Sequence, residues 1–226
     1  MDKIKLFQSV PIFTDLSRKS LETITSKAIV RNYAKNGMII MERDKGESFF
    51  VIEKGIVKVT RVNDRGQEVI LAILGEGDFF GEMALLDGEG RSANIVAVED
   101  TTALVLPRND FLHILEQFPK IAIHLLQELT KRIRRSDQQI ESLSLSAAEQ
   151  RISMTLSRLA EEMGTIKNGI VTLYNMPYQQ DIANMAGTSR ETVSRTLRKF
   201  EKSGIIKKEG KTIYILDFSS FNNIFE

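Results

Sequence analysis

Between Ile29 and Leu106 the chain alternates short runs of β-branched and aromatic residues with turn-forming residues. Runs of this kind, bounded by glycine or asparagine, predict β-strands. The turn signals recur roughly every ten residues, at Asn36-Gly37, Lys45-Gly46, Lys54-Gly55, Asp64-Arg65-Gly66 and Gly75-Glu76-Gly77. This regular spacing predicts a small antiparallel roll or barrel.

Helical periods frame the strands on both sides. Before them, Leu16 to Lys27 has helical spacing, and Ser17 or Asp15 is the expected N-cap. After Pro119, apolar or small positions follow one another at intervals of three and four residues, which is the heptad pattern of a coiled coil. This seam comprises Ala122, Leu126, Leu129, Ile133, Ser136, Ile140, Leu143 and Ala147.

The seam requires a partner, because its flanks are too charged for the helix to be buried on all sides. The flanking charges are Lys131, Arg132, Arg134, Arg135, Asp137 and Glu141. Either a second copy of the chain or the β-roll could pack against the seam. We favour the second copy, which predicts a homodimer joined by parallel helices.

The C-terminal third has the pattern of a winged helix-turn-helix. The expected elements are a helix over Ala148–Met163 that ends at Gly164, a strand over Ile170–Leu173, a helix after Pro177 and a two-stranded wing over Ile205–Leu216. Gln179–Glu201 has the spacing of a helix-turn-helix. In this span the small residue Ala183 suits the point where the two helices cross, and Gly187 suits a tight turn that requires positive φ. Thr188 followed by Glu191 predicts a capping box at the start of a second helix.

Length and composition suit a two-domain α+β protein, since the chain has 226 residues, 42% of them hydrophobic and 27% charged. We expect a β-roll in residues 1–118, a dimerisation helix in 119–147 and a winged helix in 148–226. The absence of cysteine excludes disulfides and cysteine-ligated metals. No run suits a membrane span or a signal peptide, so a cytoplasmic location without a membrane partner is expected.

Basic residues concentrate near the C-terminal end. Thr188–Lys211 carries eight basic and three acidic residues, whereas the whole chain has a net charge of only +1. The segment therefore predicts a polyanionic partner, with a solvated helix face as the alternative. Its lysines are expected to contact phosphate or to aid solubility, namely Lys199, Lys202, Lys207, Lys208 and Lys211.

The predicted second helix carries a polar face that suits base recognition. The residues on this face are Arg190, Glu191, Ser194, Arg195 and Arg198. In a major groove, arginine donates two hydrogen bonds to guanine, and a carboxylate accepts one from cytosine. Two alternatives stay open: Glu191 only caps its own helix, or Arg190 and Arg195 contact phosphate or solvent.

A second cluster of candidate residues lies in Gly75–Ala93, with the sequence GEGDFFGEMALLDGEGRSA. Arg91 is the single basic residue among five acidic ones. Either a structural salt bridge or a bound anion explains Arg91, because the glycine-rich loop and Ser92 offer backbone N–H groups and a hydroxyl. A phosphate at Arg91 and a ribose at Glu82 would suit this chemistry.

The residues GEMALLDGEGRSA resemble the phosphate-binding cassette of cyclic-nucleotide-binding domains. Together with SRETVSR, they resemble the CRP/FNR family of bacterial transcription regulators, and the similarity covers nearly the whole chain. The resemblance implies an effector-binding β-roll, a long dimerisation helix and a winged helix-turn-helix that binds palindromic double-stranded DNA. It also implies RNA polymerase as a partner.

By resemblance, the effector-binding residues in the roll are Gly81, Glu82, Met83, Ala84, Arg91, Ser92 and Ala93. Glu82 would bind the ribose 2′-hydroxyl, and Arg91 would bind the cyclic phosphate with help from Ser92. The base would meet Ser136 and Asp137 of the long helix, and Ser136 is also the polar position of the heptad seam. The DNA-binding residues would be Gln179, Thr188, Ser189, Arg190, Glu191, Ser194, Arg195 and Arg198.

The effector implied by the resemblance is a cyclic nucleotide, with cAMP first and cGMP second. The Asp137 carboxylate departs from the hydroxyl of cAMP-responsive members, and it can accept from the adenine amino group or from guanine N1 and N2. Ligand binding would change how two long helices pack. The recognition helices would then lie one DNA turn apart, about 34 Å.

Other hypotheses stay open: a dimer that binds DNA without a nucleotide or answers to another signal, an enzyme, or a cyclic-nucleotide module that tethers a kinase-like partner. We assign no catalytic residues, because the sequence has no P-loop, HExxH or Ser/His/Asp arrangement. Metal, haem and iron–sulfur cofactors are not expected. His113 and His124 flank the start of the long helix and not the predicted pocket.

Overall fold

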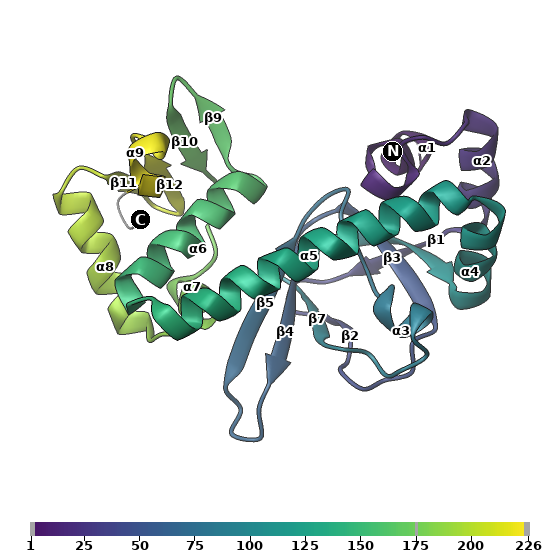
Figure 1. Cartoon of the computed structure of the whole chain (residues 1–226), viewed down its shortest axis with the longest axis horizontal. Coiled ribbons are helices and arrows are strands. Elements are labelled where there is room, and N and C mark those ends of the chain that lie inside the picture. Colours follow the sequence, from purple (N-terminus) through teal and green to yellow (C-terminus); the bar gives the residue numbers. More distant parts are fainter. Residues whose placement is uncertain (1–2, 175, 224–226) are drawn as a thin grey trace. The chain divides into compact units, whose positions relative to one another are not determined.

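The structure, a computed structural model, describes residues 3–174 and 176–223. The chain forms two compact units, Met1–Arg135 and Ser136–Glu226, and their boundary lies within the longest helix (Figure 1). The mixture of helices and sheets confirms the predicted α+β class. The finer division at residues 118 and 147 stays a prediction. Across the described residues, no helix combines the length and the apolar character that a membrane span needs.

Unit 1 is an antiparallel β-roll with helices before and after it, as predicted. Its strands are β1 (Ile29–Tyr33), β2 (Met38–Ile40), β3 (Ser48–Lys54), β4 (Val57–Val62), β5 (Glu68–Leu74), β6 (Phe79–Phe80), β7 (Asn94–Ala97) and β8 (Thr101–Pro107). They form two sheets, in the orders β1-β8-β3-β6 and β2-β7-β4-β5. The helices are α1 (Lys3–Ser9), a 3-10 turn (Pro11–Phe13), α2 (Arg18–Lys27), α3 (Met83–Leu86) and α4 (Arg108–Gln117).

The first residue of α2 is set by one of the two expected caps. Ser17 Oγ accepts a hydrogen bond from the backbone N–H of Ser20 at 3.2 Å. A hydroxyl at this position satisfies a backbone donor that the first helical turn would otherwise leave unpaired. Ser17 is therefore the cap, and Asp15 is not.

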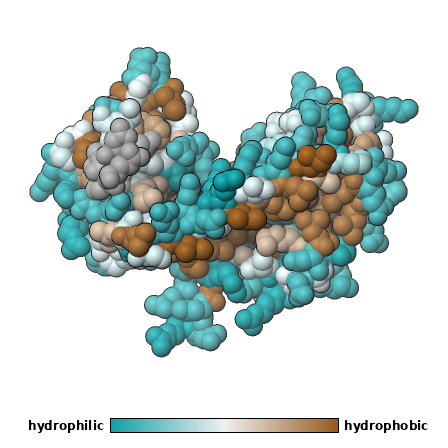
Figure 2. Space-filling view, viewed as in Figure 1, coloured by the Kyte–Doolittle hydropathy of each residue, from teal (hydrophilic) through white to brown (hydrophobic). Residues whose placement is uncertain are grey.

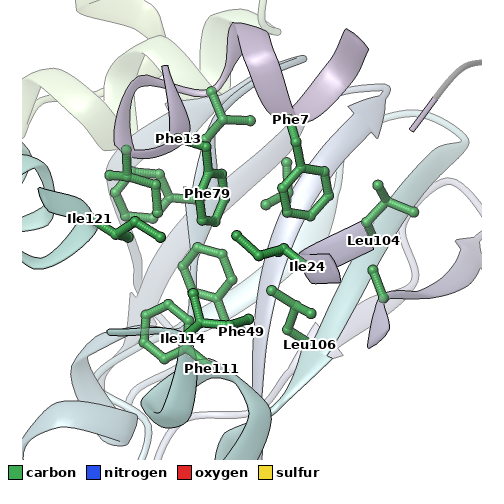
Figure 3. Packing of buried hydrophobic residues seen from close by; sticks show 14 of the residues in the cluster. Phe7, Phe13, Ile24, Phe49, Phe79, Leu104, Leu106, Phe111, Ile114 and Ile121 are labelled. Atoms are coloured by element: carbon green, nitrogen blue, oxygen red, sulfur yellow. The ribbon is translucent and has the colours of Figure 1, made fainter. Parts of the chain in front are cut away.

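Strand β3 contributes to two hydrophobic cores. Because alternate residues of a strand point to opposite faces, Phe49 joins the core under the helices while Phe50 joins the core between the two sheets. On the helix side, the rings of Phe49 and Phe111 stack with centroids 4.3 Å apart (Figure 3). This packing fixes β3, whose first residue, Ser48, contacts the candidate site described below.

The first part of helix α5 (Pro119–Leu145) buries apolar surface in unit 1. Ile121 and Leu125 belong to the helix-side core, and Leu129 packs against it. The predicted seam is wrong at its last position, because Ala147 lies beyond the end of α5, at the N-cap of the next helix. At Leu129 the core of unit 1 covers part of the side chain, as the alternative with the roll as partner expects.

The remaining large apolar positions of the seam are exposed on α5. Leu126, Ile133 and Ile140 have exposed fractions of 64%, 62% and 63%. Figure 2 shows hydrophobic side chains on the surface along this helix. Exposed apolar stripes of this kind mark interaction surfaces.

Unit 2 contains the winged helix-turn-helix. Its further elements are α6 (Ala148–Met163), β9 (Thr165–Lys167), β10 (Ile170–Leu173), α7 (Gln179–Ala186), α8 (Arg190–Lys202), β11 (Ile206–Glu209), β12 (Thr212–Ile215) and α9 (Phe218–Asn223). The strands form one antiparallel sheet in the order β11-β12-β10-β9. The predicted helices, the strand β10 and the two-stranded wing are confirmed. Strand β9 goes beyond the prediction and is joined to β10 at Asn168-Gly169, where both residues have positive φ.

Candidate functional site

Arg91 is held at the centre of the predicted effector site by two backbone carbonyls. The side chain is only 7% exposed. Its Nη1 donates to Gly81 O at 2.8 Å, and its Nη2 donates to Ser48 O at 2.9 Å. Neither of these acceptors is a carboxylate, so the two bonds differ from the structural salt bridge considered for Arg91.

Burial lowers the pKa of Arg91 from its ordinary value, and the nearby carboxylates of Glu82 and Asp44 act in the opposite direction. Arginine stays protonated in proteins, so the buried guanidinium keeps its charge. A bound anion stabilises a buried cation whose hydrogen bonds go to neutral carbonyl groups more strongly than it stabilises a cation in water. The geometry therefore suits a compact anion such as a phosphate.

The backbone of Gly81 leaves room for this arginine. Gly81 has φ +86°, a backbone conformation that residues other than glycine rarely adopt. A Cβ at this position would lie 2.8 Å from Arg91 Nη1 and 3.0 Å from Ser48 O. Glycine is therefore required here for both backbone conformation and space.

Glu82 is the second charged residue of the site, with only 2% of its surface exposed. Its Oε1 accepts a hydrogen bond from Nη1 of Arg132 on α5 at 2.7 Å. The same guanidinium donates to Phe79 O at 2.8 Å and lies over the Phe79 ring. Arg132 thus joins the site as a residue that the sequence pattern places only among the charged flanks of the seam.

The other cassette residues divide into an exposed and a buried set. Met83 and Ser92 are exposed, and Ser92 Oγ donates to Met83 Sδ at 3.6 Å. Ala84 and Ala93 are buried. Hydrogen bonds therefore join the two ends of the cassette, Arg91 to Gly81 and Ser92 to Met83, while effector binding by these residues stays a prediction.

Ser136 and Asp137, the residues predicted to meet the base, are exposed on the part of α5 that belongs to unit 2. The two histidines have acidic neighbours. His124 Nε2 lies 3.3 Å from Asp15 Oδ2, and His113 Nδ1 lies 3.8 Å from Glu116 Oε2. These positions fit ordinary packing and surface residues.

The helix-turn-helix has the predicted crossing and turn. Ala183 of α7 is buried, and Gly187 ends this helix with φ +59°. The predicted capping box at Thr188 is wrong, because the N-cap of α8 is Ser189, whose Oγ accepts from Thr192 N–H at 3.2 Å. The N–H of Thr188 instead donates to Ala183 O, so Thr188 still closes the preceding helix.

The polar face of α8 lines an open groove of about 1000 Å³. Its lining residues are Gln179, Arg190, Glu191, Ser194, Arg195, Arg198, Lys199, Lys202 and Ser203. All predicted base-reading residues of α8 therefore share one surface, while Thr188 and Ser189 are not among the residues that line it. A groove wall with five cations and one carboxylate is suited to a polyanion.

Glu191 keeps its charge at neutral pH. Its pKa is lowered first by a hydrogen bond from its own backbone N–H, then by the Ser189 hydroxyl. These contacts agree in part with the hypothesis that Glu191 interacts with its own helix start. An exposed, ionised carboxylate beside Arg190 also remains able to accept from a base.

Arg151, in the first turn of α6, holds the turn of the helix-turn-helix. Its Nε donates to Ala186 O at 2.8 Å, and its Nη2 donates to Gly187 O at 3.0 Å. Its Nη1 donates to Ser146 O at 2.7 Å. The sequence pattern gives no sign of this role, because an arginine on the polar side of an amphipathic helix usually faces solvent.

Two family models match this chain. The model described as "Cyclic nucleotide-binding domain" matches residues 30–118, and the one described as "Crp-like helix-turn-helix domain" matches residues 122–224. A relative from Thermus thermophilus named "Cyclic AMP receptor protein" is 33% identical, covering 95% of this chain and 96% of its own length.

Two solved structures share the fold. FixK2 from Bradyrhizobium japonicum has a TM-score of 0.79 at 21% identity, and the match covers 88% of this chain and 98% of that one. The c-di-GMP responsive global regulator CLP from Xanthomonas campestris has a TM-score of 0.74 at 21% identity, covering 88% and 99%. At this identity the likeness concerns the fold alone.

The two matched domains contain the two groups of residues described above, namely the cassette around Arg91 and the groove of α8. The Thermus thermophilus relative extends the match over nearly the full length of both proteins. The chain therefore belongs to the CRP/FNR family of transcription regulators, with a cyclic nucleotide-binding domain and a DNA-binding helix-turn-helix domain.

Proposed function

We propose that the protein is a homodimeric regulator that binds palindromic DNA in response to a cyclic nucleotide, with cAMP as the first candidate and cGMP as the second. The observation that carries this proposal is the groove of α8, where arginines and one glutamate share a surface. This combination fits the donor and acceptor pattern of G·C pairs in a major groove. RNA polymerase is the expected partner of the DNA-bound dimer.

The effector site is proposed on the chemistry around Arg91. The arginine offers a buried cation to the cyclic phosphate, and the carboxylate of Glu82 offers an acceptor to the ribose hydroxyl. The name of the Thermus thermophilus relative, "Cyclic AMP receptor protein", favours cAMP. Because CLP of similar fold is described as c-di-GMP responsive, the fold alone does not select the nucleotide.

The dimer is proposed on the exposed apolar residues of α5. Leu126, Ile133 and Ile140 lie at heptad spacing, and a second copy of the helix would bury all three. Ser136 and Asp137 are in the same stretch of α5. We place the nucleotide base at these two residues, so that the effector would bias how the two helices pack.

Addition of cAMP should tighten binding to a palindromic duplex, selected from random DNA, by at least about tenfold. A tenfold change corresponds to about 1.4 kcal/mol of coupling between the effector and DNA sites, which a few charge-assisted hydrogen bonds can supply. Fluorescence anisotropy of the labelled duplex measures the change, with AMP as the matched control. If cAMP, cGMP and AMP leave the affinity equal and calorimetry detects no heat, the protein binds DNA without a nucleotide.

Base readout can be separated from backbone contact with two variants of unit 2. Arg190→Ala should cost about 1 to 3 kcal/mol and relax the preference at one base pair, whereas Lys208→Ala should weaken all sequences alike. Competition anisotropy with duplexes that carry single substitutions measures both effects. A uniform loss in Arg190→Ala would show that Arg190 contacts phosphate.

A further inference from the structure

One cation of the α8 groove forms an ion pair with a carboxylate of the same chain. Lys199 lines the groove together with Arg195 and Arg198. Its Nζ lies 2.6 Å from Oε1 of Glu149, a residue in the first turn of α6. The pair therefore brings a negative charge from another helix to the edge of the surface proposed to meet DNA.

We propose that Glu149 limits the affinity of the protein for DNA by competing with a backbone phosphate for Lys199. This inference rests on the proposed function, since it assumes that the α8 groove binds DNA. A carboxylate and a phosphate oxygen accept from the same ammonium group, so Lys199 contributes its full charge to DNA only when it leaves Glu149. Once unpaired, the carboxylate of Glu149 repels the phosphate that replaces it.

The local structure explains why Glu149 lies at this position. Helix α6 begins after Ala147, which provides no side-chain cap. An acidic residue in the first turn of a helix interacts favourably with the helix dipole, and a basic residue in the last turn of α8 does so too. Glu149 and Lys199 are therefore each suited to their own helix end, and the fold brings the two ends together.

The pair is accessible enough to exchange partners. The side chains of Lys199 and Glu149 are 65% and 33% exposed. Exposed ion pairs contribute little to stability because water and salt screen them. A phosphate of the DNA backbone can therefore replace the carboxylate without unfolding the surrounding helices.

The variant Glu149→Gln tests this competition. Glutamine keeps the shape of the side chain and an oxygen that can accept from Lys199, but it removes the negative charge. Each phosphate neutralised by a protein cation changes the slope of log K against log salt by about 0.9, which amounts to about eightfold in affinity at 0.1 M salt. For each subunit that contacts DNA, we therefore expect Glu149→Gln to increase the affinity about eightfold and to make the salt slope steeper by about 0.9.

Two further variants separate the pair from a general change in charge. Glu161→Gln removes the same charge from an exposed residue near the other end of α6, and it should change affinity and salt slope much less. In a Lys199→Gln background, Glu149→Gln should lose most of its effect, because the competing cation is gone. Thermal denaturation of all variants confirms that the folded protein is compared.

The affinities are measured by anisotropy with one labelled duplex over a series of salt concentrations. The proposal is overturned if Glu149→Gln and Glu161→Gln act alike, or if Glu149→Gln acts equally with and without Lys199. In both cases binding by the unchanged protein leaves the proposed function intact. Should no form of the protein bind duplex DNA at any salt concentration, the proposed function fails and this inference fails with it.

Discussion

Arg91→Gln should weaken cAMP binding by roughly 100-fold or more, which corresponds to about 3 kcal/mol. The guanidinium is buried and would donate two charge-assisted hydrogen bonds to the cyclic phosphate, whereas glutamine has neither the charge nor the planar fork of donors. Calorimetric titration of the folded variant with cAMP measures the change in Kd. The response of DNA binding to cAMP should disappear with it.

Arg108→Gln is the matched control for this variant. Arg108 is partly buried, and its Nη1 donates to the backbone carbonyl of Ala84 in the same cassette at 3.0 Å. Arg91 itself donates to two carbonyls, so its loss also loosens the loop. If the two variants weaken cAMP binding equally, Arg91 supports the loop and does not hold the phosphate. Arg91→Lys, which keeps a charge, should recover part of the affinity only in the phosphate case.

The elements that local patterns encode could be predicted from the sequence. Turn glycines and alternating apolar residues reflect neighbours only a few positions away, so the sequence alone predicts the roll, α6 and the wing. Gly187 is an example, since a tight turn between two helices requires positive φ and the structure has φ +59° there. The cassette residues could be grouped because they are consecutive in the chain.

Contacts between distant residues could not be predicted in the same way. Arg132 and Glu82 are 50 positions apart, and no local pattern in the sequence indicates that the guanidinium of Arg132 bonds to the carboxylate of Glu82. The start of α8 was missed for a different reason. Thr188 and Ser189 are both good caps, and the structure decides between them through the bond from Thr192 N–H to Ser189 Oγ, while Thr188 N–H donates to Ala183 O of the preceding helix.

The heptad seam shows the limit of periodicity. A spacing of three and four residues identifies the apolar positions of α5, but it does not say which neighbour covers each of them. Ile121 and Leu125, outside the seam, pack the first part of α5 into the core of unit 1, and Leu129 packs against this core in part. The seam positions that stay exposed in the single chain, Leu126, Ile133 and Ile140, are the ones that the proposed second copy would cover.

Ile140→Glu should dissociate the homodimer and lower the affinity for a palindromic duplex by about 100-fold or more. Ile140 is 63% exposed in the single chain, and a second copy would bury it in the seam, where two carboxylates would face each other without water. A monomer binds one half-site at a time, so the gain from linking two recognition helices is lost. Sedimentation velocity measures the mass, and anisotropy measures the affinity.

Gln138→Glu is the control, because it adds the same charge to an exposed position of α5 outside the seam. This variant should remain dimeric and should lose at most a small part of its DNA affinity through the added charge. A dimeric Ile140→Glu with unchanged affinity would show that the two copies meet elsewhere. The three exposed apolar residues at heptad spacing would then be expected to bind a different partner, because an apolar stripe on one side of a helix is unfavourable in water unless another surface covers it.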